Sequence, residues 1–175
     1  MIEGIDIIQK EIHENAVAHG WWESDRSFGE ICALIHSELS EALEEYRNNQ
    51  PNVYWITHKP EGIAVELADA VIRILDYMER DGYHFDTLAE SAVSHNKAVF
   101  DDFGDFITRC HSDISDAYFR QQTEEDFVDR TAALSVCIAR IGAWFEANGL
   151  DLSEVIALKH AYNKSRPYRH GGKKI

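Results

Sequence analysis

One acidic motif occurs twice in this chain. Residues 36–43 read HSELSEAL and residues 111–118 read HSDISDAY, with four of the first seven positions identical and the other three of the same chemical type. A second pair of similar blocks follows in the same order, ERDGYHFDTLAESAVSHNK at 79–97 and EANGLDLSEVIALKHAYNK at 146–164. Two separated blocks in one order indicate an internal duplication. We therefore expect two related units in this chain.

Both units are expected to be helical. Apolar residues recur at spacings of three and four almost throughout, and no stretch alternates convincingly like a strand. Ser27 and Glu30 form an S-x-x-E capping box, which marks a helix start. Pro51 and Pro60 bracket a loop. Helices are expected over residues 2–19, 28–48, 61–81, 87–100, 103–121, 125–148 and 152–165.

The fold class that follows is all-α. The first unit, residues 1–100, and the second, residues 101–175, each contain too few helices to bury their own apolar faces. The two units should therefore pack together as one compact helical bundle. A chain of 175 residues with 45% hydrophobic residues is long enough for such a core.

The charge of the chain argues against some partners. A net charge of −14 opposes binding to a nucleic-acid backbone. No run of eighteen apolar residues occurs, so no membrane span is expected. Three cysteines without metal-type spacing are typical of reduced thiols, and we expect a cytoplasmic protein. Basic residues gather near the C-terminus and could serve a small anion or a metal-bound polyphosphate: Lys159, Lys164, Arg166, Arg169, Lys173 and Lys174.

Carboxylates on two successive helices form the main chemical signal. Glu38, Glu41 and Glu45 share one helix face, and Glu66 and Asp69 lie three residues apart on the next helix. Facing each other, these helices would bring four carboxylates within a few ångströms, where like charges raise one another's pKa. A divalent cation relieves that repulsion, and oxygen ligands without His or Cys suit Mg²⁺ or Mn²⁺.

A solvated acidic surface is the alternative interpretation. Glutamate-rich helices are commonly exposed, and an isolated E-x-x-E motif has almost no predictive value. E-x-x-E followed by E-x-x-D at helical phase on two successive helices is much more specific. Spacing alone leaves both interpretations open.

The motifs resemble those of a known family. ELSE at 38–41 followed by ELAD at 66–69 is similar to the E-x-x-E … E-x-x-D signature of MazG-like, all-α nucleoside triphosphate pyrophosphohydrolases. The beginning, EIHENAVAHGWWE at 11–23 and RSFGE at 26–30, and the ending, YNKSRPYRHGGKK at 162–174, resemble short members of that family. The resemblance covers the first unit fully and the second in weaker form.

This resemblance implies a function and a ligand set. Such enzymes use Mg²⁺ to hold a nucleoside triphosphate and hydrolyse its α–β phosphoanhydride to a monophosphate and pyrophosphate. Glu38, Glu41, Glu66 and Asp69 are the implied metal ligands. Glu41 is expected to orient or deprotonate the water, with Glu45 as its substitute.

The second unit keeps only half of the acidic signature. Asp113 and Asp116 are present, but the positions equivalent to Glu66 and Asp69 hold Ala133 and Val136. Two carboxylates without an opposing pair would hold Mg²⁺ poorly. The chain thus resembles tandem-repeat relatives such as the dimeric dUTPases, in which one half keeps the chemistry. We expect a pseudo-dimer, present either as a monomer or as a homodimer of such chains.

The basic ending of the family follows the second unit here. We hypothesise that Lys164, Arg166 and Arg169 reach across to phosphates at the first site, which Asn96 and Lys97 line directly. A tail that only increases solubility is the alternative.

Aromatic residues near the beginning suggest a place for the base. By its position in the family pattern, Trp22 is expected to stack on the base, with His13 nearby as a base or sugar contact. Packing of the indole in the interior is the competing interpretation. Arg73 is expected to be an ion-pair partner, and His36 to be structural.

Other functions are weighed against this one. Phosphoribosyl-ATP pyrophosphohydrolase shares the implied fold and chemistry. A di-iron bundle would need E-x-x-H pairs, which neither acidic helix contains. A non-catalytic helical interaction module would have no use for four clustered carboxylates. The base and the sugar are left open by the sequence.

Overall fold

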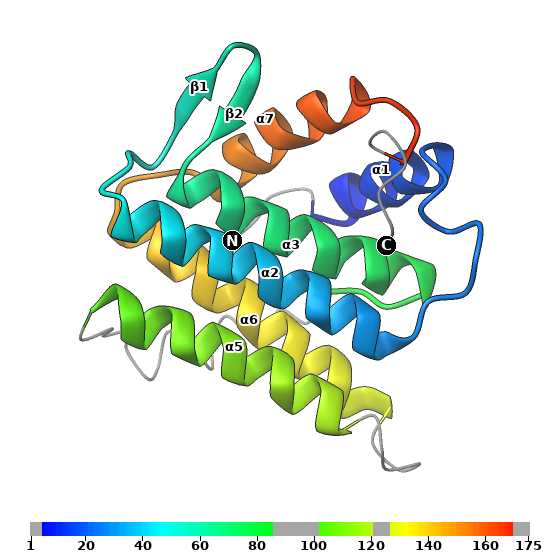
Figure 1. Ribbon diagram of the computed structural model, residues 1–175. Helices are drawn as coiled ribbons and strands as arrows, with labels where there is room; N and C mark the ends of the chain where they lie inside the picture. The colour runs from blue at the N-terminus through cyan, green and yellow to red at the C-terminus, as the bar shows by residue number, and fades with distance from the viewer. Residues whose placement is uncertain (1–4, 86–101, 121–126, 170–175) are drawn as a thin grey trace.

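The computed structural model describes residues 5–85, 102–120 and 127–169. The expected all-α class is confirmed (Figure 1). The first unit contributes three described helices and a short hairpin, and the second contributes three helices. Their bounds are α1 (Ile5–Ala18), α2 (Phe28–Arg47), β1 (Tyr54–Ile56), β2 (Lys59–Glu61), α3 (Ile63–Arg80), α5 (Phe103–Arg120), α6 (Phe127–Ala147) and α7 (Leu152–Lys164).

Local signals set several helix boundaries. The expected capping box opens α2: the Glu30 backbone N–H donates to Ser27 Oγ at 3.1 Å, and the Ser27 N–H donates to Glu30 Oε2 at 3.0 Å. Asp151 caps α7 by accepting from the backbone N–H groups of Ser153 and Glu154. The helix expected over 87–100 lies outside the described residues.

The segment between Pro51 and Pro60 differs from the expected loop. Tyr54–Ile56 pairs antiparallel with Lys59–Glu61, with Trp55 opposite Pro60. Two strands of three residues are too short to give a readable alternation of apolar and polar side chains. Thr57, rather than the Asn-Gly or Asp-Gly typical of tight hairpins, adopts the left-handed conformation at the turn. The hairpin was therefore not readable from the sequence.

Gly62 joins the hairpin to α3 and has little room. Its φ is +118°, and a Cβ built there would lie 2.5 Å from the Pro51 carbonyl oxygen and 2.7 Å from that of Asn52. Only glycine accommodates both the dihedral angle and the close backbone. This junction fixes the start of α3 at Ile63, three residues before Glu66.

Helix α3 is the central element of the fold. Figure 1 shows α1 and α7 on one side of the α2–α3 pair and α5 and α6 on the other, and the contacts between elements agree. Thirteen of the eighteen residues of α3 are buried. A helix buried on most of its surface carries polar side chains only where they have partners. Its polar residues are therefore good candidates for function.

Residues at equivalent positions of the two units meet in the bundle. His36 on α2 faces His111 on α5, with their Nδ1 atoms 2.7 Å apart and their rings stacked at a centroid distance of 5.0 Å. Each histidine carbonyl accepts from the serine four residues later, Ser40 at 2.8 Å and Ser115 at 2.9 Å. Helix α2 packs on α5, and α3 packs on α6.

Two further sequence expectations concern membrane-spanning helices and the state of the cysteines. Within the described residues, no helix has both the length and the hydropathy that crossing a membrane requires. Cys32, Cys110 and Cys137 are buried free thiols.

Candidate functional site

A cleft of about 290 Å³ lies over the first unit. Its wall combines residues of α1, the segment before α2, α2 itself, β2, α3 and α7. Helix α7 comes from the second unit, so the cleft requires both halves of the chain.

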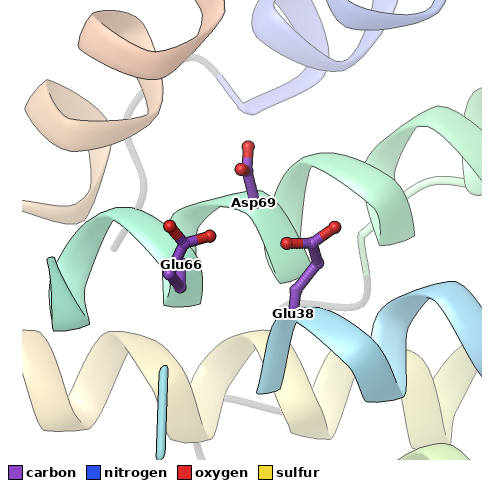
Figure 2. Close-up of side chains that lie close together, drawn as sticks. All are labelled: Glu38, Glu66 and Asp69. Carbon is purple, nitrogen blue, oxygen red and sulfur yellow. The ribbon is translucent and has the colours of Figure 1, made fainter. Parts of the chain in front are cut away.

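Three of the four expected metal ligands meet in this cleft. Glu38, Glu66 and Asp69 each offer a carboxylate oxygen, and these atoms all lie within 4.8 Å of one another. Figure 2 shows Glu38 rising from α2 towards Glu66 and Asp69, which project from neighbouring turns of α3. We call these three residues the carboxylate cluster. Glu38 is 6% exposed and Glu66 is 4% exposed, so the cluster is not a solvated acidic surface.

Glu41 and Glu45 lie beside the carboxylate cluster rather than in it. Glu41 is exposed and lines the cleft. Glu45 Oε1 accepts from the Tyr54 hydroxyl at 3.4 Å, and its buried Oε2 has no hydrogen-bond partner among the described residues. Of the two, Glu41 is the carboxylate within reach of a molecule in the cleft.

The carboxylate cluster is electrostatically unfavourable by itself. Burial, together with the charges of Asp69, Glu38 and Glu41, raises the pKa of Glu66 to about 8, against the opposing effect of Lys159. Burial likewise raises the pKa of Glu38, although Arg73 opposes the change. Removing water from carboxylates and placing them together both disfavour the charged form. A bound cation would reverse this effect.

Two basic side chains already neutralise part of the cluster. Arg73 Nε donates to Glu38 Oε1 at 2.7 Å, and Lys159 Nζ lies 2.8 Å from Asp69 Oδ2. The ion pair expected for Arg73 is therefore present. The Lys159 side chain is only 3% exposed. Burial lowers the pKa of Lys159, but Asp69 and Glu66 raise it by more, so the ammonium stays charged.

From the sequence, Lys159 was grouped with the basic residues near the C-terminus. Its contact with the carboxylate cluster was not predicted, although a signal was present. Lys159 lies four residues after Val155 and three after Ile156, on the buried face of α7. A lysine in phase with the apolar residues of a helix needs a buried partner. That partner is a carboxylate of the other unit.

The charge of the cleft differs from that of the whole protein. Five of the described lining residues are basic and five are acidic. The basic ones are Arg26, Lys59, Arg73, Lys159 and Arg166. The acidic ones are Glu38, Glu41, Glu66, Asp69 and Asp76. In a chain of net charge −14, such a concentration of basic side chains suits an anionic ligand.

The C-terminal segment contacts the first unit, as expected. Of its three basic residues expected at the phosphates, only one lines the cleft. Arg166 lines the cleft. Lys164 lies outside it, with Nζ 3.5 Å from Glu11 Oε2. Arg169 donates to the Gly20 carbonyl at 3.2 Å and to Glu23 at 3.0 Å, which ties the chain end to the segment after α1. Asn96 and Lys97 lie outside the described residues.

His13 and Trp22 converge on one carboxylate. His13 Nδ1 lies 2.7 Å from Asp76 Oδ1, and Trp22 Nε1 donates to the same oxygen at 2.9 Å. The hydrogen bond to Asp76 raises the pKa of His13 and outweighs the effect of burial. Trp22 packs against the hydrophobic core, and it is Trp21 that lines the cleft.

Two buried polar atoms of the cleft residues are unsatisfied. His160 Nε2 and Asn163 Oδ1, both on α7, have no hydrogen-bond partner among the described residues. His160 is 4% exposed, and burial lowers its pKa, as does Lys164. Buried polar atoms without partners are rare in native proteins and suggest a missing ligand.

The second unit forms no equivalent cluster within the described residues. Arg140 Nε donates to Asp113 Oδ2 at 2.7 Å, which repeats the Arg73–Glu38 pair at equivalent positions. Asp116 pairs with Arg120 at 2.8 Å on the surface of α5. No group of three candidate ligands was found there.

Comparisons with known proteins identified no similar protein. No protein-family model, no curated protein and no solved structure matches this chain. The family resemblance therefore rests on the sequence motifs alone, and the function has to be argued from the site.

Proposed function

We propose that this protein is a divalent-cation-dependent nucleoside triphosphate pyrophosphohydrolase. It would hydrolyse the α–β phosphoanhydride to a nucleoside monophosphate and pyrophosphate. One observation carries the proposal: a buried cluster of Glu38, Glu66 and Asp69 lies in a cleft that also gathers five basic side chains. Acidic ligands for a cation and basic groups for an anion are needed together when the substrate is a metal-bound polyphosphate.

The carboxylate cluster suits Mg²⁺ or Mn²⁺. Its donors are all carboxylate oxygens, and hard oxygen ligands select these ions over softer metals. Such an ion, when bound, neutralises charge on phosphate oxygens and lowers the pKa of its water. Glu38, Glu66 and Asp69 would hold it, and the exposed Glu41 is near enough to both buried glutamates to affect their pKa.

The remaining charged residues would serve the phosphates and the water. Lys159, Arg73 and Arg166 line the cleft and can donate to phosphate oxygens, which stabilises charge during phosphoryl transfer. Glu41 is exposed in the cleft and can accept the proton of the attacking water.

The same proposal includes a pseudo-dimer with one active half. The contact between equivalent histidines, His36 and His111, supports an approximate twofold axis between α2 and α5. The repeated arginine–carboxylate pairs, Glu38 with Arg73 and Asp113 with Arg140, support it as well. The second unit would then supply α7 to the cleft instead of a second active site.

Pyrophosphate release tests the proposal. The purified protein is assayed with Mg²⁺ against ribo- and deoxynucleoside triphosphates and phosphoribosyl-ATP. We expect release of pyrophosphate that requires the cation. Glu66→Gln should abolish turnover without loss of helix content, because burial already favours the neutral form of this side chain. Glu44→Gln, at an exposed position of α2, is the matched control. Full activity of Glu66→Gln would contradict the metal assignment.

A further inference from the structure

Asp76 is a cleft residue that the proposed hydrolysis does not use. It lies on α3, and its side chain is 18% exposed. Asp76 lies seven positions after Asp69. At about 1.5 Å per residue this places it about 10.5 Å farther along the helix axis, after nearly two full turns. Both carboxylates therefore lie on the same side of α3, one at the carboxylate cluster and one farther along the cleft. That separation is comparable with the span from the α-phosphate to the far edge of the base in an extended nucleotide.

The two oxygens of Asp76 have different surroundings. Oδ1 accepts from both His13 and Trp22. No hydrogen bond from the described residues reaches Oδ2. Two donors on one oxygen fix the carboxylate in orientation and leave the other oxygen as an acceptor for a molecule in the cleft.

The neighbouring residues suit a flat heterocycle with an acceptor. Trp21 lines the cleft together with the apolar side chains of Ile12 and Ile72. The Arg26 guanidinium lies 5.1 Å from the centre of the Trp21 ring and makes no hydrogen bond to the described residues. Arg26 is also close enough to Asp76 for their charges to interact. A fixed carboxylate oxygen, which can accept two hydrogen bonds, beside a guanidinium donor is the complement of two adjacent donors beside an acceptor.

From these groups we infer that the cleft selects guanine nucleotides. Guanine presents two adjacent N–H donors, N1–H and N2–H, that can share Asp76 Oδ2, and its O6 accepts from Arg26. Adenine, cytosine and uracil each present a single donor beside an acceptor on the corresponding edge. A fixed, half-buried acceptor discriminates against a base that leaves it less well paired. This inference rests on the proposed function, because the carboxylate cluster places the phosphates.

A substitution at Asp76 gives a test that structural damage cannot imitate. In Asp76→Asn the carbonyl oxygen stays with the His13 and Trp22 donors, which turns the amide NH₂ towards the cleft. An acceptor facing the base thereby becomes a donor. The N–H donors of guanine then face the N–H donors of the introduced amide, which weakens binding. Xanthine carries a carbonyl at C2 in place of the amino group, and this carbonyl can accept from the amide.

The experiment measures binding with analogues that cannot be hydrolysed. The full chain with Mg²⁺ is titrated calorimetrically with the α,β-methylene analogues of GTP, XTP, ATP, CTP and UTP. We expect the guanine analogue to bind at least about tenfold more tightly than the others. We also expect Asp76→Asn to reverse the order of guanine and xanthine. Asp116→Asn, on the surface of α5, is the control and should leave the order unchanged.

The outcomes separate this inference from the proposed function. Equal affinities for all bases in a protein that releases pyrophosphate would overturn guanine selection and leave the hydrolase proposal standing. Selective guanine binding without pyrophosphate release would overturn the hydrolase proposal and leave guanine selection standing. An Asp76→Asn protein that keeps the original order of bases would overturn the role of Asp76, and the absence of any nucleotide binding would overturn both.

Discussion

At the scale of single residues, the site is a balance of buried charges. Glu38 and Glu66 are almost inaccessible to water, and Arg73 and Lys159 compensate them and Asp69. Buried ion pairs are costly to assemble and more costly to break. Buried groups with perturbed pKa values of this kind are common at functional sites.

Lys159→Met tests this balance. Removing the ammonium leaves the Asp69 carboxylate without its ion-pair partner, so unfolding should become easier by about 3 kcal/mol. Mn²⁺ should bind the variant more tightly in the absence of nucleotide, because a competing cation is gone. Urea denaturation and electron paramagnetic resonance of free Mn²⁺ measure the two effects.

Lys164→Met is the control for this pair of measurements. Lys164 is half exposed and contacts Glu11 at 3.5 Å, so its loss should change stability by less than about 1 kcal/mol and leave Mn²⁺ affinity unchanged. Weaker Mn²⁺ binding in Lys159→Met than in this control would contradict the competition between Lys159 and the metal.

At the scale of elements, the junction before α3 positions the carboxylate cluster. Gly62→Ala would place a methyl group 2.5 Å from the Pro51 carbonyl oxygen at a φ of +118°. We expect a loss of about 2 kcal/mol in the free energy of unfolding, measured with urea. Gly82→Ala also has a positive φ, but its Cβ would meet nothing within 4 Å, so about 1 kcal/mol is expected. Equal losses would contradict the steric argument.

The end of α7 is the second element that serves the cleft. Truncation after Tyr162 removes Asn163 and Arg166 from the cleft wall and the contacts of Arg169 with Gly20 and Glu23. We expect the Michaelis constant for the nucleotide to rise severalfold, because positive charge near the phosphates is lost. An unchanged Michaelis constant would show that the segment only solubilises the protein.

Much of the helical framework could be predicted from the sequence, because the signals that set it act between residues close together in the chain. The apolar spacing and the Ser27–Glu30 capping box act within one helix, and the ends of α2 and α3 lie within two residues of the expected positions. Spacing left a metal site and a solvated surface both open, and the family resemblance named four ligands. Of these, Glu38, Glu66 and Asp69 meet, and Glu41 lies beside them in the cleft.

What could not be predicted depends on contacts between distant segments. The Tyr54–Ile56 strand forms only by pairing with β2. Lys159 reaches Asp69 across 90 residues of chain. The choice between Trp21 and Trp22 at the cleft depends on the position of Asp76 on α3, since it is Trp22 that donates to this carboxylate. Only Lys159 has a signature within a single helix, its phase with the buried residues of α7, and that signature does not identify Asp69 as its partner.

At the scale of the whole molecule, the two halves of the chain pack against each other through α2 and α5. The His36–His111 contact lies at this interface, between residues that are equivalent in the two units. Burial lowers the pKa of His36, and burial together with His36 lowers that of His111. Two protonated imidazoles at 2.7 Å would repel each other.

This contact predicts how stability varies with pH. Because the folded-state pKa of both histidines lies below the ordinary value of 6.5, the unfolded chain binds more protons just below that pH. The contribution of these two histidines to stability should therefore fall as the pH drops below 6.5, whereas the raised pKa values of Glu66 and His13 act in the opposite direction. Relative to the unsubstituted protein, the double variant His36→Gln, His111→Gln should therefore become more stable as the pH falls from 7.5 to 5, measured by urea denaturation. His58→Gln, at an exposed turn, is the control and should keep the original slope.

We propose that the carboxylate cluster holds the cation of a metal–triphosphate complex. A crystal structure of the protein with Mn²⁺ and an α,β-methylene nucleoside triphosphate is the decisive test. We expect anomalous density bounded by Glu38, Glu66 and Asp69, in contact with the phosphates. Density for the nucleotide elsewhere, with Arg73 and Lys159 still paired to these carboxylates and no ion between them, would contradict it.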